Sequence, residues 1–350
     1  MDFFVTIKKT DPREEEIIEN DLLVHRYIPK KFSEFKIHQN IAKKINNILE
    51  NNDILNLYLY GPSGSGKYIL AKSYINTYYQ SHCKLELKTF KKDTKEIDYY
   101  QSNNHYEIVF NNYNFNDLNL VRSFMENIVN KGTQIFGNKK NIILIKNTDI
   151  LKDNVFKILR FYIEKYYLFN IFIVISEKKN IKYANFFCLV RVPSPTNEEI
   201  TILCKDICKK ECIKIRKLEC EEIVKLANRN ISNLKNIIEY SFINDKYEKY
   251  IDPCNDKLKF LYKVIKKKNM NTLFLVRELL YELLVENIEP NIILRYLLCK
   301  YKKEYVSQKM SYEKFLDIIK ILKDTSHKIA IGLRPIVNLE CCIIEIIDLL

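Results

Sequence analysis

The stretch LYLYGPSGSGKYILAKSYI, residues 57–75, decides the fold. It contains a short apolar strand, a glycine-rich loop of the pattern G-x-x-x-x-G-K, and the start of a helix. In that setting, successive backbone N–H groups and the helix N-terminus bind phosphate oxygens, and the final lysine reaches the β- and γ-phosphates. A chance match to the pattern is the alternative. The predicted nucleotide-binding residues here are Gly61, Pro62, Ser63, Gly64, Ser65, Gly66, Lys67 and Tyr68.

Two departures from an ATPase pattern argue against hydrolysis. The usual serine or threonine after the lysine places a short hydroxyl on Mg²⁺, whereas the phenol of Tyr68 carries its oxygen far beyond that position. An ATPase also needs an acidic pair after a later strand. The strand expected at 142–145 is followed by Lys146 and Asn147, which can be neither base nor metal ligand, and Asp149 is expected to face elsewhere. We therefore predict nucleotide holding, no catalytic residue and no metal site.

Composition limits the class of protein. The 350 residues carry a formal charge of +13, which fits either a polyanionic partner or simple solubility. The N-terminal sequence has no signal-peptide apolar core, and no apolar run approaches the roughly 20 residues of a membrane helix. Ten cysteines without paired C-x-x-C spacing indicate a reducing compartment. Cys204, Cys208 and Cys212 share a helical face, and core packing is favoured over a metal site.

The pattern along the chain predicts an α/β domain followed by helices. Residues 1–20 form a polar N-terminal extension. Strand-like runs alternate with helical stretches at about 67–80, 116–130 and 153–167, which favours a parallel sheet. The expected strands are Leu57–Tyr60, Leu85–Leu87, Glu107–Phe110, Ile142–Ile145 and Ile171–Ile175. After the run VRVPSPT the expected helices lie at 197–212, 219–228, 231–245, 272–286, 290–302, 311–324 and 326–348, with a polar break at 244–256.

Several separated segments resemble the AAA+ sliding-clamp loaders, in particular the replication factor C small subunits. LLVHRYIPKKFSEF (22–35) is similar to an N-terminal segment that lies against the nucleotide base, which implies base-side roles for Arg26 and Tyr27. GPSGSGK (61–67) has the family's loop spelling, and RVPSPTNEEI (191–200) resembles the junction to its helical lid. FKILRFYIEKYY (156–167) and VRELLYELLVENIEPNIILRYLL (276–298) resemble a core helix and the C-terminal collar. The junction (191–200) and the collar segment (276–298) most resemble one subunit type, the subunit at the end of the pentameric arc. The ATP site of that subunit type is degenerate.

The same resemblance identifies what this chain lacks. The family's arginine finger, which enters the neighbouring subunit's ATP site, corresponds to Phe187. A sensor asparagine corresponds to Ser176, and the lid's sensor arginine falls near Ser232. Arg160 is retained on a helix that faces the neighbouring site in the family, and is therefore the trans-acting candidate. A chain without its finger cannot stabilise charge in the neighbouring site in the usual way.

The resemblance implies an AAA+ core at 21–193, a helical lid at 194–250 and a helical collar or oligomerisation domain at 251–350. The expected function is that of a non-catalytic clamp-loader subunit, with structurally bound ATP or ADP and little reason to expect Mg²⁺. Its expected partners are the other subunits of a hetero-pentamer, a sliding clamp and primer–template DNA without sequence specificity, in the nucleus and without a membrane. The alternatives are a subunit of a checkpoint-type loader and a free-standing AAA+ ATPase that uses Asp149 or Glu177.

Overall fold

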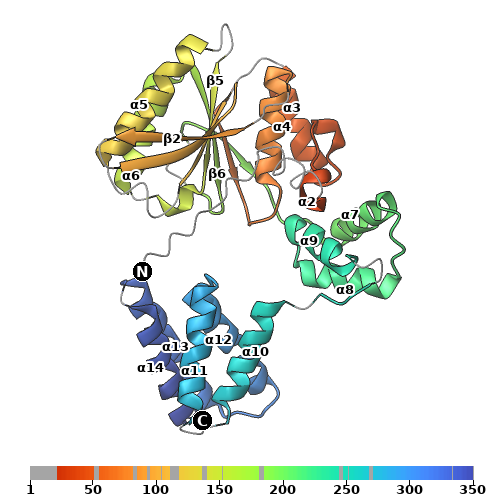
Figure 1. The fold of residues 1–350 in the computed structure, drawn as a ribbon, viewed down its shortest axis with the longest axis vertical. Helices are drawn as coiled ribbons and strands as arrows, with labels where there is room; N and C mark the ends of the chain where they lie inside the picture. Colours follow the sequence, from red (N-terminus) through yellow and green to blue (C-terminus); the bar gives the residue numbers. More distant parts are fainter. Residues whose placement is uncertain are drawn as a thin grey trace, which may run out of the picture. The chain divides into compact units, whose positions relative to one another are not determined.

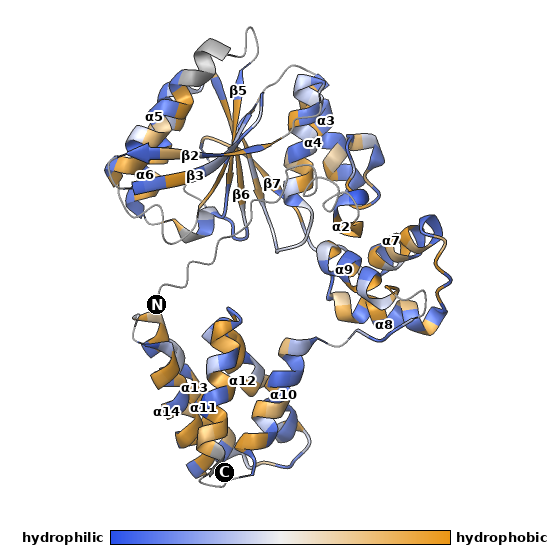
Figure 2. Ribbon diagram, viewed as in Figure 1, coloured by the Kyte–Doolittle hydropathy of each residue, from blue (hydrophilic) through white to orange (hydrophobic). Residues whose placement is uncertain are grey.

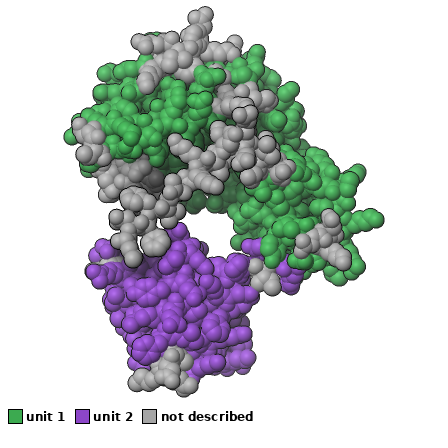
Figure 3. Space-filling view, viewed as in Figure 1, with its two compact units in different colours: residues 1–248 green, residues 249–350 purple. Residues whose placement is uncertain are grey.

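The computed structural model describes residues 22–50, 55–81, 85–92, 95–103, 105–110, 118–135, 140–151, 153–180, 185–243, 247–250, 252–267, 271–332 and 334–349. The predicted extension at 1–20 lies outside them. The chain divides into two compact units, Met1–Glu248 and Lys249–Leu350 (Figure 3).

The first unit contains a seven-stranded sheet in the order β2-β3-β4-β5-β6-β1-β7. Its parallel part consists of β4 (His105–Val109), β5 (Asn141–Lys146), β6 (Asn170–Ser176), β1 (Leu57–Tyr60) and β7 (Cys188–Arg191). β2 (Glu86–Lys92) and β3 (Lys95–Gln101) add an antiparallel pair at one edge. The α/β class predicted from the sequence is confirmed, although β3 and β7 were not predicted.

Helices cover both faces of this sheet, as Figure 1 shows. α3 (Gln39–Glu50) and α4 (Lys67–Tyr79) pack on one face, around Leu57, Leu59 and Leu144. α5 (Leu118–Ile135) and α6 (Asp153–Tyr166) pack on the other face, around Tyr58 and Phe172. The interiors of β5 and β6 are continuously apolar, because both faces of these strands are covered (Figure 2).

Three helices follow the sheet in the same unit: α7 (Asn197–Lys210), α8 (Lys217–Ala227) and α9 (Ile231–Ser241). α7 begins with a capping box, in which the Thr196 hydroxyl accepts from the Glu199 N–H and the Glu199 carboxylate accepts from the Thr196 N–H. Cys204 and Cys208 are buried as predicted, but Cys212 is exposed. In the described part of the chain no group of His, Cys, Asp and Glu side chains is arranged to hold a metal ion.

The second unit is a helical bundle with its own apolar core. It comprises α10 (Pro253–Ile265), α11 (Asn271–Val285), α12 (Pro290–Val306), α13 (Tyr312–Ala330) and α14 (Pro335–Leu349). The break predicted between 324 and 326 was wrong, since α13 continues to Ala330 and the chain turns at Gly332, whose φ is +94°. The predicted polar break also extended too far, because α10 begins at Pro253 with Asp252 as its N-cap. Leu279, Leu283, Ile293 and Leu297 are buried core residues, whereas Leu298 is 37% exposed.

Candidate nucleotide site

The loop between β1 and α4 has the shape that its glycines allow. Gly64 has φ +68°, a conformation that residues with a Cβ atom rarely adopt. The buried side chain of Lys67 turns back into the loop, where its Nζ donates to the carbonyls of Gly61 at 2.6 Å and Pro62 at 2.7 Å. Burial lowers the pKa of Lys67, while nearby Glu177 and Asp149 oppose that change. The loop thus holds a cation beside its own backbone N–H groups.

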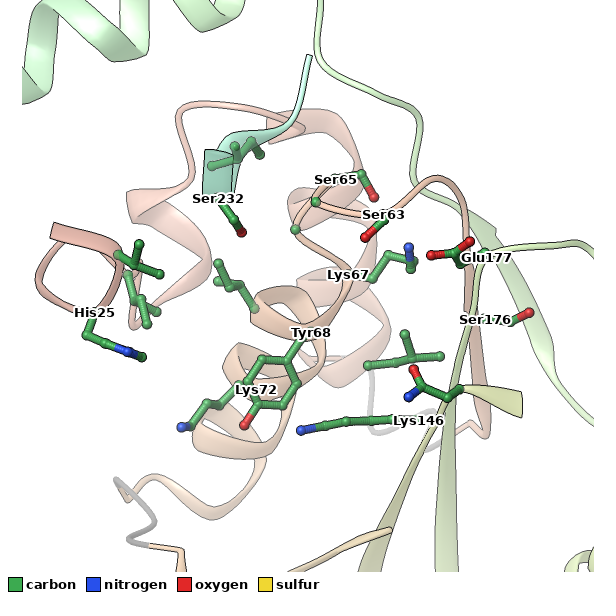
Figure 4. Close-up of a pocket in the computed structure, with 18 of the residues that line it drawn as sticks. His25, Ser63, Ser65, Lys67, Tyr68, Lys72, Lys146, Ser176, Glu177 and Ser232 are labelled. Atoms are coloured by element: carbon green, nitrogen blue, oxygen red, sulfur yellow. The ribbon is translucent and has the colours of Figure 1, made fainter. Parts of the chain in front are cut away.

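A cavity of about 1230 Å³ opens beside this loop. The loop, the first turn of α4, the ends of β5 and β6, and the start of α9 all contribute to its wall (Figure 4). The predicted residues Ser63, Gly64, Ser65, Gly66, Lys67 and Tyr68 line it, as do Lys146 and Asn147. The structure therefore brings the loop residues and both unusual strand-end residues to one cavity.

Tyr68 and Lys146 are in direct contact. The Lys146 Nζ lies 3.7 Å from the centre of the Tyr68 ring, a cation–π geometry. Figure 4 shows the Lys146 side chain reaching toward the Tyr68 hydroxyl while Lys67 points toward Glu177. Tyr68, at the position of the usual metal-binding hydroxyl, is therefore packed against Lys146, at the position of the first acid.

Glu107 on β4 holds this pair in place. Its carboxylate accepts from the Tyr68 hydroxyl at 3.1 and 3.2 Å, and forms an ion pair with Lys146 at 2.7 Å. The side chain of Glu107 is only 1% exposed. Burial opposes its ionisation, but the bond to His105 and the Lys146 ammonium outweigh burial and hold the pKa of Glu107 below its usual value.

The network continues away from the cavity through two buried residues. His105 Nε2 lies 3.1 Å from Glu107 Oε1, and His105 Nδ1 lies 2.6 Å from Ser102 Oγ. All three side chains are buried, and none of the three is among the residues that line the cavity.

Asp149, which was expected to face elsewhere, lines the cavity together with Glu177, but its carboxylate is already hydrogen-bonded. It accepts from Ser176 Oγ at 2.6 Å and from the backbone N–H groups of Glu177 at 2.6 Å and Lys178 at 3.1 Å. These bonds tie η2 (Thr148–Ile150) to the end of β6. Asn147, just before η2, has φ +58°, a left-handed conformation that asparagine tolerates.

The start of α9 closes over the loop. The Ile231 N–H donates to the Gly64 carbonyl at 3.0 Å. The Asn230 side chain caps α9 by accepting from the N–H groups of Ser232 and Asn233 at 2.9 and 3.1 Å. Ser232, near which the sensor position was predicted to fall, lines the cavity. Sequence reasoning missed Lys235, which lies three residues later on the same helical face and also lines the cavity.

Lys235 is a buried cation in the cavity wall. Its Nζ donates to the carbonyls of Tyr27 at 3.0 Å and Val24 at 3.3 Å. Burial lowers the pKa of Lys235 to about 8. The lysine thereby joins α9 to α2 (Leu23–Arg26), the segment that was predicted to lie against the base.

The two residues predicted to lie beside the base, Arg26 and Tyr27, do not line this cavity. Both contact Glu211 at the end of α7. Their neighbours Val24, His25 and Ile28 line the cavity instead. Burial and the Glu211 contact raise the pKa of Tyr27 to about 12.

The two residues that the resemblance relates to a neighbouring subunit also lie outside the cavity. Phe187 is 7% exposed and packs edge-on against Tyr58 in the sheet core. The Arg160 side chain is 53% exposed, donates to Glu164 at 2.8 Å and lies 4.9 Å from the Phe186 ring centre.

The residues of the cavity suit phosphate better than they suit a divalent metal. The loop supplies backbone N–H groups and Lys67 for phosphate oxygens. At the place where a metal would be bound, the chain presents the Tyr68 ring and the Lys146 ammonium, neither of which is a ligand for Mg²⁺. The carboxylates of Glu107 and Asp149 are already hydrogen-bonded, and that of Glu177 lines the cavity beside Lys67 (Figure 4). The residues at the two usual metal-holding positions therefore suit a nucleotide and not Mg²⁺.

A sheet with a phosphate loop after its first strand, a cluster of helices closing on that loop and a C-terminal helical bundle define a P-loop protein of the AAA+ class. A family profile described as "Replication factor C subunit 3, C-terminal domain" matches residues 257–350. "Replication factor C subunit 3" of Arabidopsis thaliana is 26% identical, covering 94% of this chain and 97% of the plant protein. "Replication factor C subunit 3" of Homo sapiens is 24% identical over 94% of this chain and 96% of the human protein. The chain is thus similar to replication factor C small subunits over nearly its whole length, and its C-terminal part matches the profile of their C-terminal domain.

Among solved structures, the Thermotoga maritima RuvB Holliday junction branch migration motor has a TM-score of 0.46 and 14% identity, over 69% of this chain and 80% of that chain. Within the described residues, no helix is long and apolar enough to cross a membrane.

Proposed function

We propose that this chain is a non-catalytic, architectural subunit of a replication factor C-like clamp loader. It would help to load a sliding clamp onto primer–template DNA during replication or repair. Its similarity to replication factor C subunits supports the clamp-loading part of this proposal. The observation that carries the non-catalytic part is the Lys146–Tyr68 contact, because it fills the position where an ATPase keeps its metal.

The chain would hold ATP or ADP as a structural ligand. Three features support this role: the phosphate loop, Lys67, and the start of α9, which is hydrogen-bonded to the loop. All three line the end of the cavity where the phosphates would bind. Because neither of the usual metal-holding positions carries a ligand for Mg²⁺, bound ATP would not be cut at this site. We assign the AAA+ core to residues 21–193, the helical lid to 194–250 and the collar to 251–350.

The neighbouring subunit would have to work without a finger from this chain. Phe187 takes that place in the sequence and is a core residue here. We assign Arg160 as the cation offered to a neighbour, because its guanidinium is half exposed and lies over Phe186, the residue next to the missing finger. The pentamer, the clamp, the DNA and a nuclear location belong to the same proposal.

Two alternatives make different predictions. A subunit of a checkpoint-type loader would carry the same site but would assemble with a different large subunit. A free-standing ATPase would need Asp149 or Glu177 as its base. The hydrogen bonds that engage Asp149 argue against its use, so such an enzyme would have to rely on Glu177, which lines the cavity.

Native mass spectrometry of the complex purified through this chain tests the proposal. We expect one copy of this chain with four distinct AAA+ partners and a retained nucleotide mass. A conventional or checkpoint-type large subunit in that complex would distinguish the two loader assignments. A lone monomer or a homo-hexamer would contradict the loader function.

A further inference from the structure

The two groups that hold Mg²⁺ in a P-loop site are both replaced in this chain by groups that contact each other. The metal is ordinarily held by the hydroxyl after the loop lysine and by a strand-end aspartate. In this chain those positions carry Tyr68 and Lys146, and the Lys146 Nζ lies 3.7 Å from the Tyr68 ring centre. The replacement thus places the fixed positive charge of Lys146 where a P-loop site normally binds Mg²⁺ from solution.

The Lys146 ammonium is held there by the buried carboxylate of Glu107. Lys146 pairs with Glu107 at 2.7 Å, and the Glu107 side chain is 1% exposed while that of Lys146 is 22% exposed. The Tyr68 hydroxyl donates to the same carboxylate at 3.1 Å. His105 lies within hydrogen-bond distance of its other side. Glu107 is therefore saturated by protein groups, and the lysine is fixed with one side facing the cavity.

A divalent cation would be repelled from this place. Like charges a few ångströms apart repel strongly in a partly buried site, and the carboxylates of Glu107 and Asp149 are already hydrogen-bonded. The Glu177 carboxylate, which also lines the cavity, lies on the Lys67 side (Figure 4). The need for positive charge near the phosphates remains, because a diphosphate carries several negative charges. The Lys146 ammonium lines the same cavity as Lys67 and meets that need from within the chain.

We propose that the Lys146 ammonium, fixed between Tyr68 and Glu107, replaces Mg²⁺, so that this site binds a nucleoside diphosphate or triphosphate without a divalent metal. The inference rests on the proposed nucleotide-holding function and adds to it the identity of the charge that holds the phosphates. It also assigns Glu107 as the positioning residue for that charge.

The test measures the affinity of the full chain for fluorescent ADP in saturating Mg²⁺ and in excess EDTA. We expect the two dissociation constants to agree within about twofold, because no metal takes part in binding. Binding that weakens tenfold or more in EDTA would overturn this inference and leave nucleotide holding intact. No binding in either condition would overturn the nucleotide-holding function itself, and the inference with it.

A charge-balanced variant separates a phosphate-facing role of Lys146 from a purely structural one. Glu107→Gln/Lys146→Met removes both charges of the buried pair together, so that no unpaired carboxylate is left inside. We expect ADP affinity in EDTA to fall about tenfold or more, as befits the loss of a charge-assisted contact. Lys146→Arg, which keeps the charge, is expected to retain binding within a few fold. If the double variant binds like the unaltered chain, Lys146 serves only to neutralise Glu107 and the inference fails.

Glu96→Gln/Lys91→Met is the matched control. Lys91 also pairs with a glutamate, Glu96, in the same unit, but its side chain is 69% exposed and is not among the residues that line the cavity. This double substitution removes both charges of an exposed pair, as Glu107→Gln/Lys146→Met does for the buried pair. We expect it to leave ADP affinity unchanged in both conditions, and a loss equal to that of the buried-pair variant would show a general charge effect.

Discussion

The Nζ of Lys146 lies 3.7 Å from the centre of the Tyr68 ring. In sequence these residues are 78 positions apart (146 − 68), and each by itself is a departure from an ATPase pattern. In space they share one partner, Glu107, and form one cluster in the wall of the nucleotide cavity. The two departures are therefore a single structural change, and altering one member alone is expected to disturb the others.

Glu107→Gln is expected to lower the free energy of unfolding by about 2 kcal/mol at neutral pH, since it weakens the charge-assisted bonds to Lys146 and His105. The effect should depend on pH. The pKa of Glu107 is lowered in the folded chain, so its stabilising contribution is complete above its unfolded pKa and is lost as pH falls through the folded value. Urea unfolding of both proteins should give a constant difference above pH ~5 that shrinks below pH ~4.

Glu96→Gln is the control for that experiment, because the Glu96 side chain is 51% exposed and pairs with Lys91 at the surface. Its effect should stay within about 0.5 kcal/mol at every pH. A difference between the unaltered chain and Glu107→Gln that grows as pH falls would mean that the buried carboxylate is neutral in the folded protein.

Gly64→Ala is expected to separate α9 from the phosphate loop. A Cβ atom at Gly64 would lie 2.0 Å from Asn230 Oδ1, the atom that caps α9. We expect a loss of about 2–4 kcal/mol in the free energy of unfolding. This value sums the cost of an alanine in a left-handed backbone conformation and the cost of the steric clash. Thermal unfolding followed by circular dichroism would measure it.

Gly332→Ala gives the matched comparison. Gly332 also has positive φ, +94°, but its added Cβ would meet no atom within 4 Å. It should show only the left-handed part of the cost, about 1–2 kcal/mol. Equal losses for the two variants would mean that Asn230 moves away freely and that the contact between α9 and the loop is loose.

Phe187→Arg, which restores the family's finger residue by sequence, is expected to damage the fold instead of restoring a finger. Phe187 is 7% exposed and packs against Tyr58, so the substitution places a charge in the core. We expect a loss of about 3 kcal/mol or more in the free energy of unfolding. Phe161→Arg, at a side chain that is 54% exposed, should be nearly neutral in the same thermal measurement. A stable Phe187→Arg protein would show that this segment can leave the core.

The loop and the fold class could be predicted because their signals are local. The spacing of Gly61, Gly66 and Lys67 and the apolar strand before them are properties of one short stretch. The loss of the acidic pair could also be predicted, since Lys146 and Asn147 directly follow the apolar run at 142–145. These predictions needed no knowledge of which residues meet in space.

The rest of the site depends on contacts between distant segments. Glu107 lies within the strand β4 and becomes a partner of Tyr68 and Lys146 only when β4 and β5 pair side by side. Its one local signal was a charged residue inside an apolar run. Arg26 and Tyr27 were assigned by resemblance alone, and in the structure their side chains contact Glu211 on a helix more than 180 residues later.

The fate of ATP bound to this chain tests the central claim most directly. The purified full chain would be loaded with ATP, freed of excess nucleotide, and its bound nucleotide identified by chromatography over several hours. We predict that the bound nucleotide remains ATP, because the positions of metal ligand and base hold Tyr68, Lys146 and Asn147. Conversion of the bound ATP to ADP, abolished by Lys67→Ala, would contradict the account.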